Sequence, residues 1–291
     1  MSLPIAQLAV GGIAIGGAYG LIATAYSLVY RTTRTINFAL GDMAVLGAYV
    51  AYAGPGPIKD RLWLGSIVAV AAIALLSVVV EIFAFRPLYR HGPVFVVASS
   101  IALVFVLEDL IQLLWGTATI NAPAIGSGSH TVGGVVITDQ QILILGVAIT
   151  FLAMLQVFLK TRTGIAMRSS AENREVAALL GISPRVMITI SFALAGVAAS
   201  IGGILVAPLT LLRPGAGGII GLTAVIAAIV GGLGTLPGAL LGGMVIGLVQ
   251  VFSSYLVGGQ YSSVITFSIL ILLLLVRPSG LFGEEGLATR Q

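Results

Sequence analysis

The sequence predicts an all-α integral membrane protein, a single-domain bundle of about eight or nine transmembrane helices over residues 1–291. The first observation is composition, because 58% of the residues are hydrophobic, only 8% are charged, and the mean hydropathy is +1.12. No soluble core can hide that much apolar surface, so lipid must cover most of it. The second is a series of long unbroken apolar runs, which favours helices over the alternating strands of a barrel. The third is that Lys and Arg lie mostly between these runs.

Nine segments are apolar over roughly the 20 residues that one membrane crossing needs. They are 7–30, 36–53, 62–85, 94–115, 139–160, 185–207, 218–234, 238–257 and 261–276. The motif Gly231-Gly-Leu-Gly-Thr-Leu-Pro-Gly238 joins the seventh segment to the eighth. It is either a tight turn between two spans or the break in a re-entrant segment, so the span count is nine or eight.

Basic residues are distributed unevenly between the two sides of the predicted bundle. Lys and Arg accumulate in cytoplasmic loops, and alternation through nine spans puts only Lys59, Arg61 and Arg213 on one side. The other side collects Arg31, Arg34, Arg86, Arg90, Lys160, Arg162, Arg168, Arg174, Arg185, Arg277 and Arg290. We therefore expect an external N-terminus, an external loop at about 116–138, a cytoplasmic loop at about 161–184 and a cytoplasmic C-terminus. Orientation also explains the net charge of +4 without nucleic acid binding.

Glycine is abundant, with 38 residues, and many of them recur at four-residue spacing. Small residues at this spacing let helix backbones approach closely in lipid, so we expect tight helix packing, with a few positions acting as hinges. The residues at this spacing are Gly12, Gly16 and Gly20 in the first segment, and Gly238 with Gly242 and Gly243 with Gly247 in the eighth.

A weak internal repeat also involves these glycines. Gly16-Gly-Ala-Tyr-Gly-Leu21 is similar to Gly217-Gly-Ile-Ile-Gly-Leu222, and the stretch 39–47 is similar to 239–247. The matches predict a parallel repeat in which spans one to three correspond to spans seven to nine. Short glycine-rich matches also arise by chance in membrane proteins, so both interpretations stay open.

The loop between Lys160 and Arg185 predicts a short amphipathic helix over 165–180, ended by Gly181. Ser183 and Pro184 then fit the N-cap and first turn of the next span. The predicted apolar face contains Met167, Ala171, Ala178, Leu179 and Leu180, and the predicted solvated face contains Arg168, Glu172, Arg174 and Glu175. Such a helix either docks into a groove on a partner protein or lies in the lipid interface.

Acidic residues inside apolar segments are costly and usually face a cavity or a partner. Those that qualify are Asp42, Glu81, Glu108 and Asp109. Glu81 lies five residues before Arg86, so a structural ion pair is predicted. Asp42 follows Asn37 in a stretch whose Asn and Gly can interrupt a helix. These two residues either line a path through the membrane or bridge neighbouring helices.

Signals of enzymatic chemistry are missing from the sequence. Lys59 and Lys160 are the only lysines, and neither lies in a phosphate-binding P-loop. His91 and His130 are isolated from other metal-ligand residues, and the absence of cysteine excludes thiolate sites. The stretch 126–130 is predicted to be a flexible external loop. We expect no catalytic, cofactor or metal site in this chain.

Blocks of residues along nearly the whole chain resemble the LivH-type permeases of branched-chain amino acid ABC importers. The first block runs from Gly17-Ala-Tyr-Gly-Leu-Ile-Ala to Ile36-Asn-Phe-Ala-Leu-Gly-Asp42. The family usually carries His where this chain has Leu40, and Glu where it has Asp42. The later blocks are Glu81 with Arg86-Pro87, Thr163-Gly-Ile-Ala-Met-Arg168, Ala171-Glu-Asn173, Leu179-Leu-Gly-Ile182, Gly231-Gly-Leu-Gly-Thr-Leu-Pro-Gly-Ala239 and Arg277-Pro-Ser-Gly-Leu-Phe-Gly283.

The resemblance implies a multi-pass permease subunit of a bacterial inner membrane. The implied partners are a second homologous permease, two ABC ATPase subunits that bind ATP and Mg, and an external substrate-binding protein. The cytoplasmic loop then corresponds to the coupling helix that seats on the ATPases, with Arg168, Ala171, Glu172, Asn173, Leu180 and Gly181 as its candidate residues. Tyr19, Asn37 and Asp42 are the candidates for the translocation path.

The substrate and the energy source have alternatives. Members of the family also carry urea, short amides or other small solutes, so branched-chain amino acids are the default expectation. A self-sufficient secondary transporter or channel, with Asp42 or Glu108 as its ion site, is the main competing hypothesis. A membrane scaffold without transport is a third.

Overall fold

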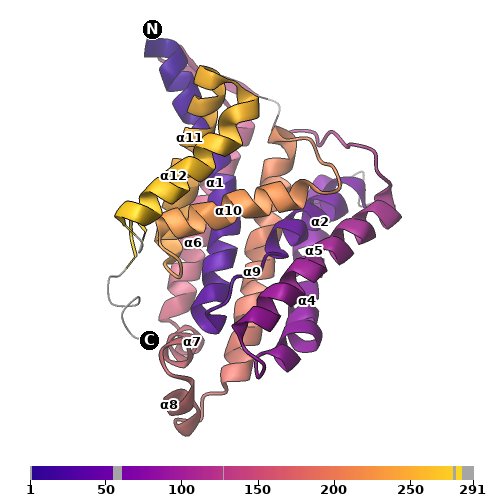
Figure 1. The fold of residues 1–291 in the computed structure, drawn as a ribbon. Helices are drawn as coiled ribbons and strands as arrows, with labels where there is room; N and C mark the ends of the chain where they lie inside the picture. The colour runs from indigo at the N-terminus through magenta and orange to yellow at the C-terminus, as the bar shows by residue number, and fades with distance from the viewer. Residues whose placement is uncertain (1, 55–60, 127, 278–279, 284–291) are drawn as a thin grey trace.

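The computed structural model describes residues 2–54, 61–126, 128–277 and 280–283, and these residues form a helical bundle (Figure 1). The longer helices are α1 (Ser2–Thr33), α4 (Leu62–Val80), α5 (Pro93–Trp115), α6 (Asp139–Lys160), α9 (Pro184–Val206) and α11 (Leu236–Val257). The shorter helices are α2 (Leu40–Ala53), α7 (Arg162–Glu172), α8 (Arg174–Leu179), α10 (Ala216–Gly231) and α12 (Ser262–Val276). The remaining elements are the hairpin β1 (Ser129–Val132) and β2 (Val135–Thr138), the π-turn η1 (Glu81–Phe85), and the 3-10 turns η2 (Arg86–Leu88), η3 (Ala207–Leu209) and η4 (Gly259–Tyr261).

Each of the nine predicted apolar segments contains a helix, but two of these helices are short. Seven helical stretches of the described residues are long and apolar enough to cross a membrane, and α2 and α10 are shorter. At 1.5 Å per residue, the 14 residues of α2 reach about 21 Å and the 16 residues of α10 about 24 Å. Both values are below the roughly 30 Å of a hydrocarbon core. The predicted spans 36–53 and 218–234 are therefore too long, because each includes a turn.

The core of the bundle lies where α1 packs against α11 and α9, with α2 and α10 against the same group (Figure 1). In the most apolar window of the α9 span 72% of the residues are buried, whereas the value for the α12 span is 11%. The outer helices α4, α5, α6 and α12 carry exposed apolar side chains, as expected for surfaces that contact lipid.

Glycines bring the backbones of α1 and α11 into direct contact, as their spacing predicted. A Cβ added to Gly16 would lie 2.6 Å from the carbonyl oxygen of Gly243, and a Cβ on Gly12 would lie 2.9 Å from the Cα of Leu248. Gly242 faces Gly231 of α10 in the same way. Tight packing is therefore confirmed for these glycines, and the hinge role stays a prediction.

Two of the helix contacts follow the predicted internal repeat. Gly20 of α1 packs on Leu240 of α11, and Gly221 of α10 packs on Gly41 of α2. In the sequence match Gly20 corresponds to Gly221, and Leu240 lies beside the position that corresponds to Gly41. The contact of α1 with α11 thus resembles the contact of α10 with α2. The repeat over three spans stays a prediction.

The motif between α10 and α11 forms a tight turn, but α10 is shorter than a full membrane span, so the choice between two spans and a re-entrant segment stays open. Gly232 and Gly234 adopt φ values of +101° and +87°, which residues with a Cβ atom rarely adopt. The C-terminal segment returns to this turn, where the Leu281 N–H donates to the Val230 carbonyl at 2.8 Å and the Phe282 N–H to Gly231 at 3.3 Å. Two of the sequence blocks that carry the family resemblance, 231–239 and 277–283, therefore meet in space.

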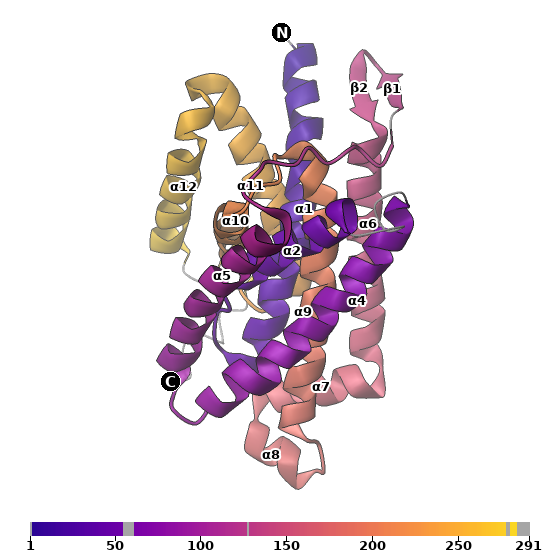
Figure 2. The same cartoon turned by 90° about the vertical axis from the view of Figure 1, so that its right-hand side faces the viewer.

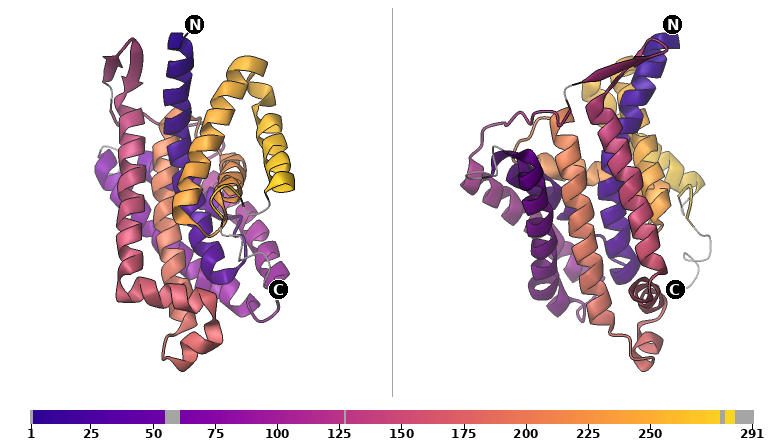
Figure 3. Two further views of the ribbon diagram at one scale, coloured as in Figure 1. Left: turned by 90° about the vertical axis from the view of Figure 1, so that its left-hand side faces the viewer. Right: turned by 180° about the vertical axis from the view of Figure 1, so that it is seen from behind.

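The two ends of the bundle differ in what they carry. The N-terminal end of α1 and the β1–β2 hairpin lie at one end, and α7 and α8 project from the opposite end (Figure 2). Views from two further directions show the same separation (Figure 3). The predicted external and cytoplasmic loops are thus on opposite ends.

Candidate functional site

The loop predicted as one amphipathic helix over 165–180 is two short helices, α7 and α8. Asn173 interrupts the helix with extended backbone angles, φ −147° and ψ 108°. Its Oδ1 accepts hydrogen bonds from the backbone N–H groups of Glu175 at 3.0 Å and Val176 at 3.1 Å, and so caps the start of α8. An Asn followed two residues later by Glu is an N-terminal helix signal that could have predicted this break.

The break divides the predicted apolar face of the loop. Met167 on α7 is buried and Ala171 is half-buried, whereas Ala178, Leu179 and Leu180 are exposed. One continuous face over all five residues was therefore a wrong prediction, because Asn173 changes the direction of the chain. Part of the predicted face anchors the loop and part points away from the bundle.

An exposed apolar surface lies on α8 and immediately after it. We call Val176, Leu179 and Leu180, which are 50%, 87% and 73% exposed, the α8 apolar face. Glu172 and Glu175 are exposed beside it, as predicted. Large exposed apolar side chains within a charged loop are typical of a protein contact or a lipid contact.

The C-terminal boundary of the loop agrees with its sequence signals. Gly181 adopts φ +78° after α8, in the left-handed region that favours glycine. Pro184 occupies the first turn of α9. Ser183 is at the predicted N-cap position, although its side chain forms no capping hydrogen bond.

Two arginines attach the loop to the bundle. Arg168 Nη2 donates to the Leu159 carbonyl at 2.6 Å, so this side chain is half-buried and not solvated as predicted. Arg174 Nη2 donates to the Thr32 carbonyl at 2.6 Å. Thr32 lies in the last turn of α1, where carbonyl groups have no partner within the helix. Arg174 therefore links α8 directly to the end of α1.

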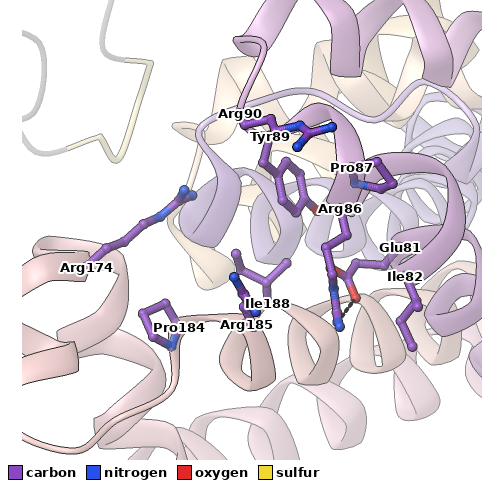
Figure 4. A pocket seen from close by; sticks show the side chains of 10 residues that line it. All are labelled: Glu81, Ile82, Arg86, Pro87, Tyr89, Arg90, Arg174, Pro184, Arg185 and Ile188. Atoms are coloured by element: carbon purple, nitrogen blue, oxygen red, sulfur yellow. Dashed lines mark hydrogen bonds and ion pairs between the residues drawn. The ribbon is translucent and has the colours of Figure 1, made fainter.

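The predicted ion pair of Glu81 and Arg86 is present at the same end (Figure 4). Arg86 Nε and Nη2 donate to the two carboxylate oxygens at 3.1 Å and 2.7 Å, and Arg86 Nη2 also donates to Thr189 Oγ1 at 2.7 Å. Residues five apart on an α-helix point about 140° apart. The π-turn η1 removes this offset, because its i to i+5 bonding places Arg86 above Glu81.

Asn37 and Asp42 lie at the corner between α1 and α2, deep inside the bundle. They are 2% and 1% exposed. Asn37 Oδ1 accepts from the Ala39 N–H at 3.1 Å and so shapes the start of α2. Both carboxylate oxygens of Asp42 are buried and lack a hydrogen-bond partner among the described residues. A Cβ on Gly217 of α10 would clash with this carboxylate, so Asp42 packs against the first turn of α10.

Neither of two pockets among the described residues is lined by Tyr19, Asn37 or Asp42. Tyr19 is 5% exposed and interacts with Gln250 of α11. A pocket of about 560 Å³ lies elsewhere, between the end of α4 and the start of α9. The role of Tyr19, Asn37 and Asp42 in a translocation path therefore stays a prediction.

Glu108 and Asp109 on α5 have different surroundings. Glu108 is half-buried beside Gly215, where a Cβ would lie 2.9 Å from Glu108 Oε1. Gly215 precedes the first residue of α10, so a carboxylate here is near the positive end of a helix dipole. Asp109 is exposed.

The predicted external loop 116–138 ends in a hairpin, whose first strand includes the last two residues of the stretch 126–130; the flexibility of that stretch stays a prediction, and residue 127 lies outside the described residues. Gly133 and Gly134 turn between β1 and β2 with φ values of +60° and +83°. Gln7 of α1 exchanges hydrogen bonds of 2.7 Å and 2.8 Å with the backbone of Val136. His130 Nε2 lies 3.1 Å from Asp139 Oδ1, so this histidine is paired locally.

Comparison with known proteins gives a consistent match over the chain. A family model described as branched-chain amino acid transport system / permease component matches residues 8–274. The permease protein BraD of a high-affinity branched-chain amino acid transport system from Pseudomonas aeruginosa is 33% identical over 295 residues, covering 96% of this chain and 95% of BraD. LivH from Salmonella typhimurium is 32% identical over 290 residues, covering 94% of both chains. A probable LivH from Methanocaldococcus jannaschii is 28% identical over 307 residues, covering 94% of this chain and 91% of its own.

A solved structure has a similar fold. The chain matches PsaBC from Streptococcus pneumoniae, solved in complex with Fab, with a TM-score of 0.52 over 94% of this chain and 91% of that one. The sequence identity is 12%, so this match concerns the fold alone. The helical arrangement is thus found in another protein of nearly equal extent.

Proposed function

Because this chain belongs to the branched-chain amino acid transport system permease family, we propose that it is the membrane-spanning subunit of a binding-protein-dependent ABC importer. Separate ATPase subunits, which carry ATP and Mg, drive it, and it pairs with a second homologous permease. The observation that carries this proposal is the α8 apolar face at the end of a loop tied to the bundle by two arginines.

The α8 apolar face fits a protein partner at the cytoplasmic end. Leu179 and Leu180 protrude from a loop whose neighbouring side chains, Glu172 and Glu175, are charged and exposed. An apolar centre with a polar rim is the usual organisation of a protein interface. In this orientation the N-terminus and the β1–β2 hairpin are external, where a substrate-binding protein would dock.

The contacts of Arg174 give a route from the ATPases to the membrane. Closure of the ATPases would push α8, and the bond from Arg174 to the Thr32 carbonyl would carry the displacement to the end of α1. The following corner is held by Asn37, which bonds the first residues of α2. Asp42 lies on α2 against Gly217, so movement of this corner would shift α2 against α10.

Branched-chain or other small amino acids are the proposed substrates. This rests on what the printed names of BraD and LivH say of those proteins. A path lined mainly by small apolar residues needs no tight site if a binding protein selects the substrate. Competition of leucine, isoleucine and valine against urea and short amides in uptake assays distinguishes the substrate classes.

One observation favours a second candidate, a self-sufficient carrier. Asp42 is a buried carboxylate without a partner among the described residues, which is a feature of ion sites within membranes. A carrier would transport solute as an isolated chain in response to an ion gradient. It would also be insensitive to changes on α8.

Co-purification tests the proposed function. The tagged chain is extracted from its native membrane in mild detergent, and the proteins that accompany it are identified. We expect ATPase subunits with the parent and their loss in a Leu179→Asp/Leu180→Asp variant. The control is Val132→Asp/Val136→Asp, which places the same two charges on apolar residues of the hairpin that are 64% and 40% exposed. A parent that purifies alone contradicts the proposal and favours the carrier.

A further inference from the structure

An arginine-rich pocket of about 560 Å³ lies where the end of α4 meets the start of α9 (Figure 4). Arg86 and Arg90 approach it from the α4–α5 side, and Arg174 and Arg185 from the α8–α9 side. Glu81 is the single carboxylate in the lining, and both its oxygens already accept bonds from Arg86. The pocket therefore has a large excess of positive charge.

Several of the donors in this pocket are uncommitted. The guanidinium groups of Arg90 and Arg185 form no ion pair or hydrogen bond with the described residues, although the Arg185 carbonyl accepts a bond from Thr189 Oγ1. Arg174 uses Nη2 for Thr32. The Tyr89 hydroxyl is buried without a partner in the described part of the chain. Burial and the nearby Glu81 carboxylate raise the pKa of Tyr89, so its hydroxyl keeps its proton and stays a hydrogen-bond donor.

The pocket lies at the ends of apolar helical stretches, which is where lipid headgroups contact a membrane-spanning protein. The apolar helical stretches Leu62–Leu88, Pro93–Trp115 and Pro184–Leu209 all have an end here. Exposed apolar side chains lie close to the pocket-lining residues along the chain, with Phe83 76% exposed on η1 next to Ile82, and Val94 75% exposed at the start of α5. A ligand in this place would have its anionic group among the arginines and its apolar part along these side chains.

We propose that this pocket binds the phosphate of an anionic phospholipid, with the acyl chains lying along η1 and α5. Basic pockets between the cytoplasmic ends of membrane helices recognise such headgroups. The preference of Lys and Arg for the cytoplasmic side of a membrane explains why arginines lie at this end of the bundle. That preference does not require four of them to surround one pocket. The guanidinium groups match a phosphodiester in charge and in donor geometry.

A bound phosphate would connect the α4–α5 side of the bundle to α8, on which the ATPases would push in the proposed transport cycle. It would join Arg86 and Arg90 on the bundle to Arg174 and Arg185 around the loop. The anionic lipid content of the membrane would then affect how firmly α8 is held. This consequence rests on the proposed function, whereas lipid binding itself does not.

Lipid titration tests the proposal on the full-length chain. The purified chain in a neutral detergent is titrated with phosphatidylglycerol or with phosphatidylcholine of the same acyl chains, and bound lipid is counted by native mass spectrometry. We expect phosphatidylglycerol to bind about tenfold tighter or more. The Arg90→Gln/Arg185→Gln variant should lose this preference, whereas Arg162→Gln, an exposed arginine on α7 outside the pocket, should keep it.

Three results would overturn the proposal. The first is equal binding of the two lipids by the parent. The second is an unchanged preference in the double variant, provided that its melting temperature equals that of the parent. The third is displacement of phosphatidylglycerol by millimolar inorganic phosphate, which would assign the pocket to a free anion. Failure of lipid binding would leave the co-purification of ATPases unaffected, so the two proposals fail separately.

Discussion

The α1–α11 interface and the arginine-rich pocket belong to the same bundle but are held together differently. At the interface, a Cβ on Gly16 would lie 2.6 Å from the backbone of α11, so no side chain separates the helices. At the pocket, long side chains such as Arg86 and Arg174 bridge a space of about 560 Å³. Close packing has no alternative arrangement of similar energy, whereas long polar side chains can exchange partners. We therefore expect movement at the pocket end of the bundle and rigidity at the α1–α11 interface.

Gly16→Leu at the α1–α11 interface should have the largest effect on stability. The added side chain would overlap with the backbone at Gly243 and Met244, which cannot move without separating the helices. We expect a loss of about 3 kcal/mol or more in stability, measured as a lower melting temperature in detergent. Gly146→Leu on α6 is the control, because nothing lies within 4 Å of its Cβ position. Equal melting of the two variants would contradict a close α1–α11 contact.

Removing one partner of the ion pair at the pocket end should have a smaller effect. Arg86→Gln leaves the carboxylate of Glu81, whose side chain is 0% exposed, with Thr189 as its partner. Breaking a buried pair costs about 3–5 kcal/mol, and we expect about 2 kcal/mol because a third of Arg86 faces solvent. Thermal unfolding is compared with that of Arg90→Gln, whose side chain is exposed. An identical decrease for both variants would show that the pair is not what stabilises this end.

Two adjacent glycines of α10, Gly217 and Gly218, should respond differently to the addition of one methyl group. Gly217→Ala introduces a Cβ against the Asp42 carboxylate, so we expect a loss of about 1–2 kcal/mol. Gly218→Ala has open space around its Cβ, so it should be neutral or stabilising by up to about 1 kcal/mol through helix propensity. Chemical denaturation of both variants checks the sign. Stabilisation by both would mean that α10 is not closely packed on α2.

The sequence was sufficient for features that depend on local pattern. Hydropathy located a helix within each of the nine apolar segments, and four-residue glycine spacing predicted close helix packing at Gly16, although not that α11 is its partner. The spacing of Glu81 and Arg86 predicted their pair. These features are set by residues within one or two turns of each other, so no knowledge of the fold is required.

Other features depend on contacts that the sequence does not display. The short length of α2 follows from the turn that Asn37 makes at the bundle core. Arg174 and Thr32 are 142 positions apart, and the pocket collects arginines from three separate stretches. No periodicity in the chain relates such residues. The candidate residues Arg168 and Leu180 were grouped together by the sequence, whereas one is bonded into the bundle and the other is exposed.

In the proposed transport cycle, the loop that contains α7 and α8 drives the membrane helices through the bond from Arg174 to the end of α1. The most direct measurement is substrate uptake per ATP hydrolysed by the assembled importer in liposomes of fixed lipid composition, for Arg174→Gln. Arg162→Gln and Arg90→Gln are the controls, since the first lies outside the pocket and the second lines it without reaching α1. We predict that ATP hydrolysis persists in all three, and that uptake per ATP falls about tenfold in Arg174→Gln alone, as expected for the loss of a charged hydrogen bond. Unchanged uptake per ATP in Arg174→Gln would show that this bond does not couple ATP hydrolysis to transport.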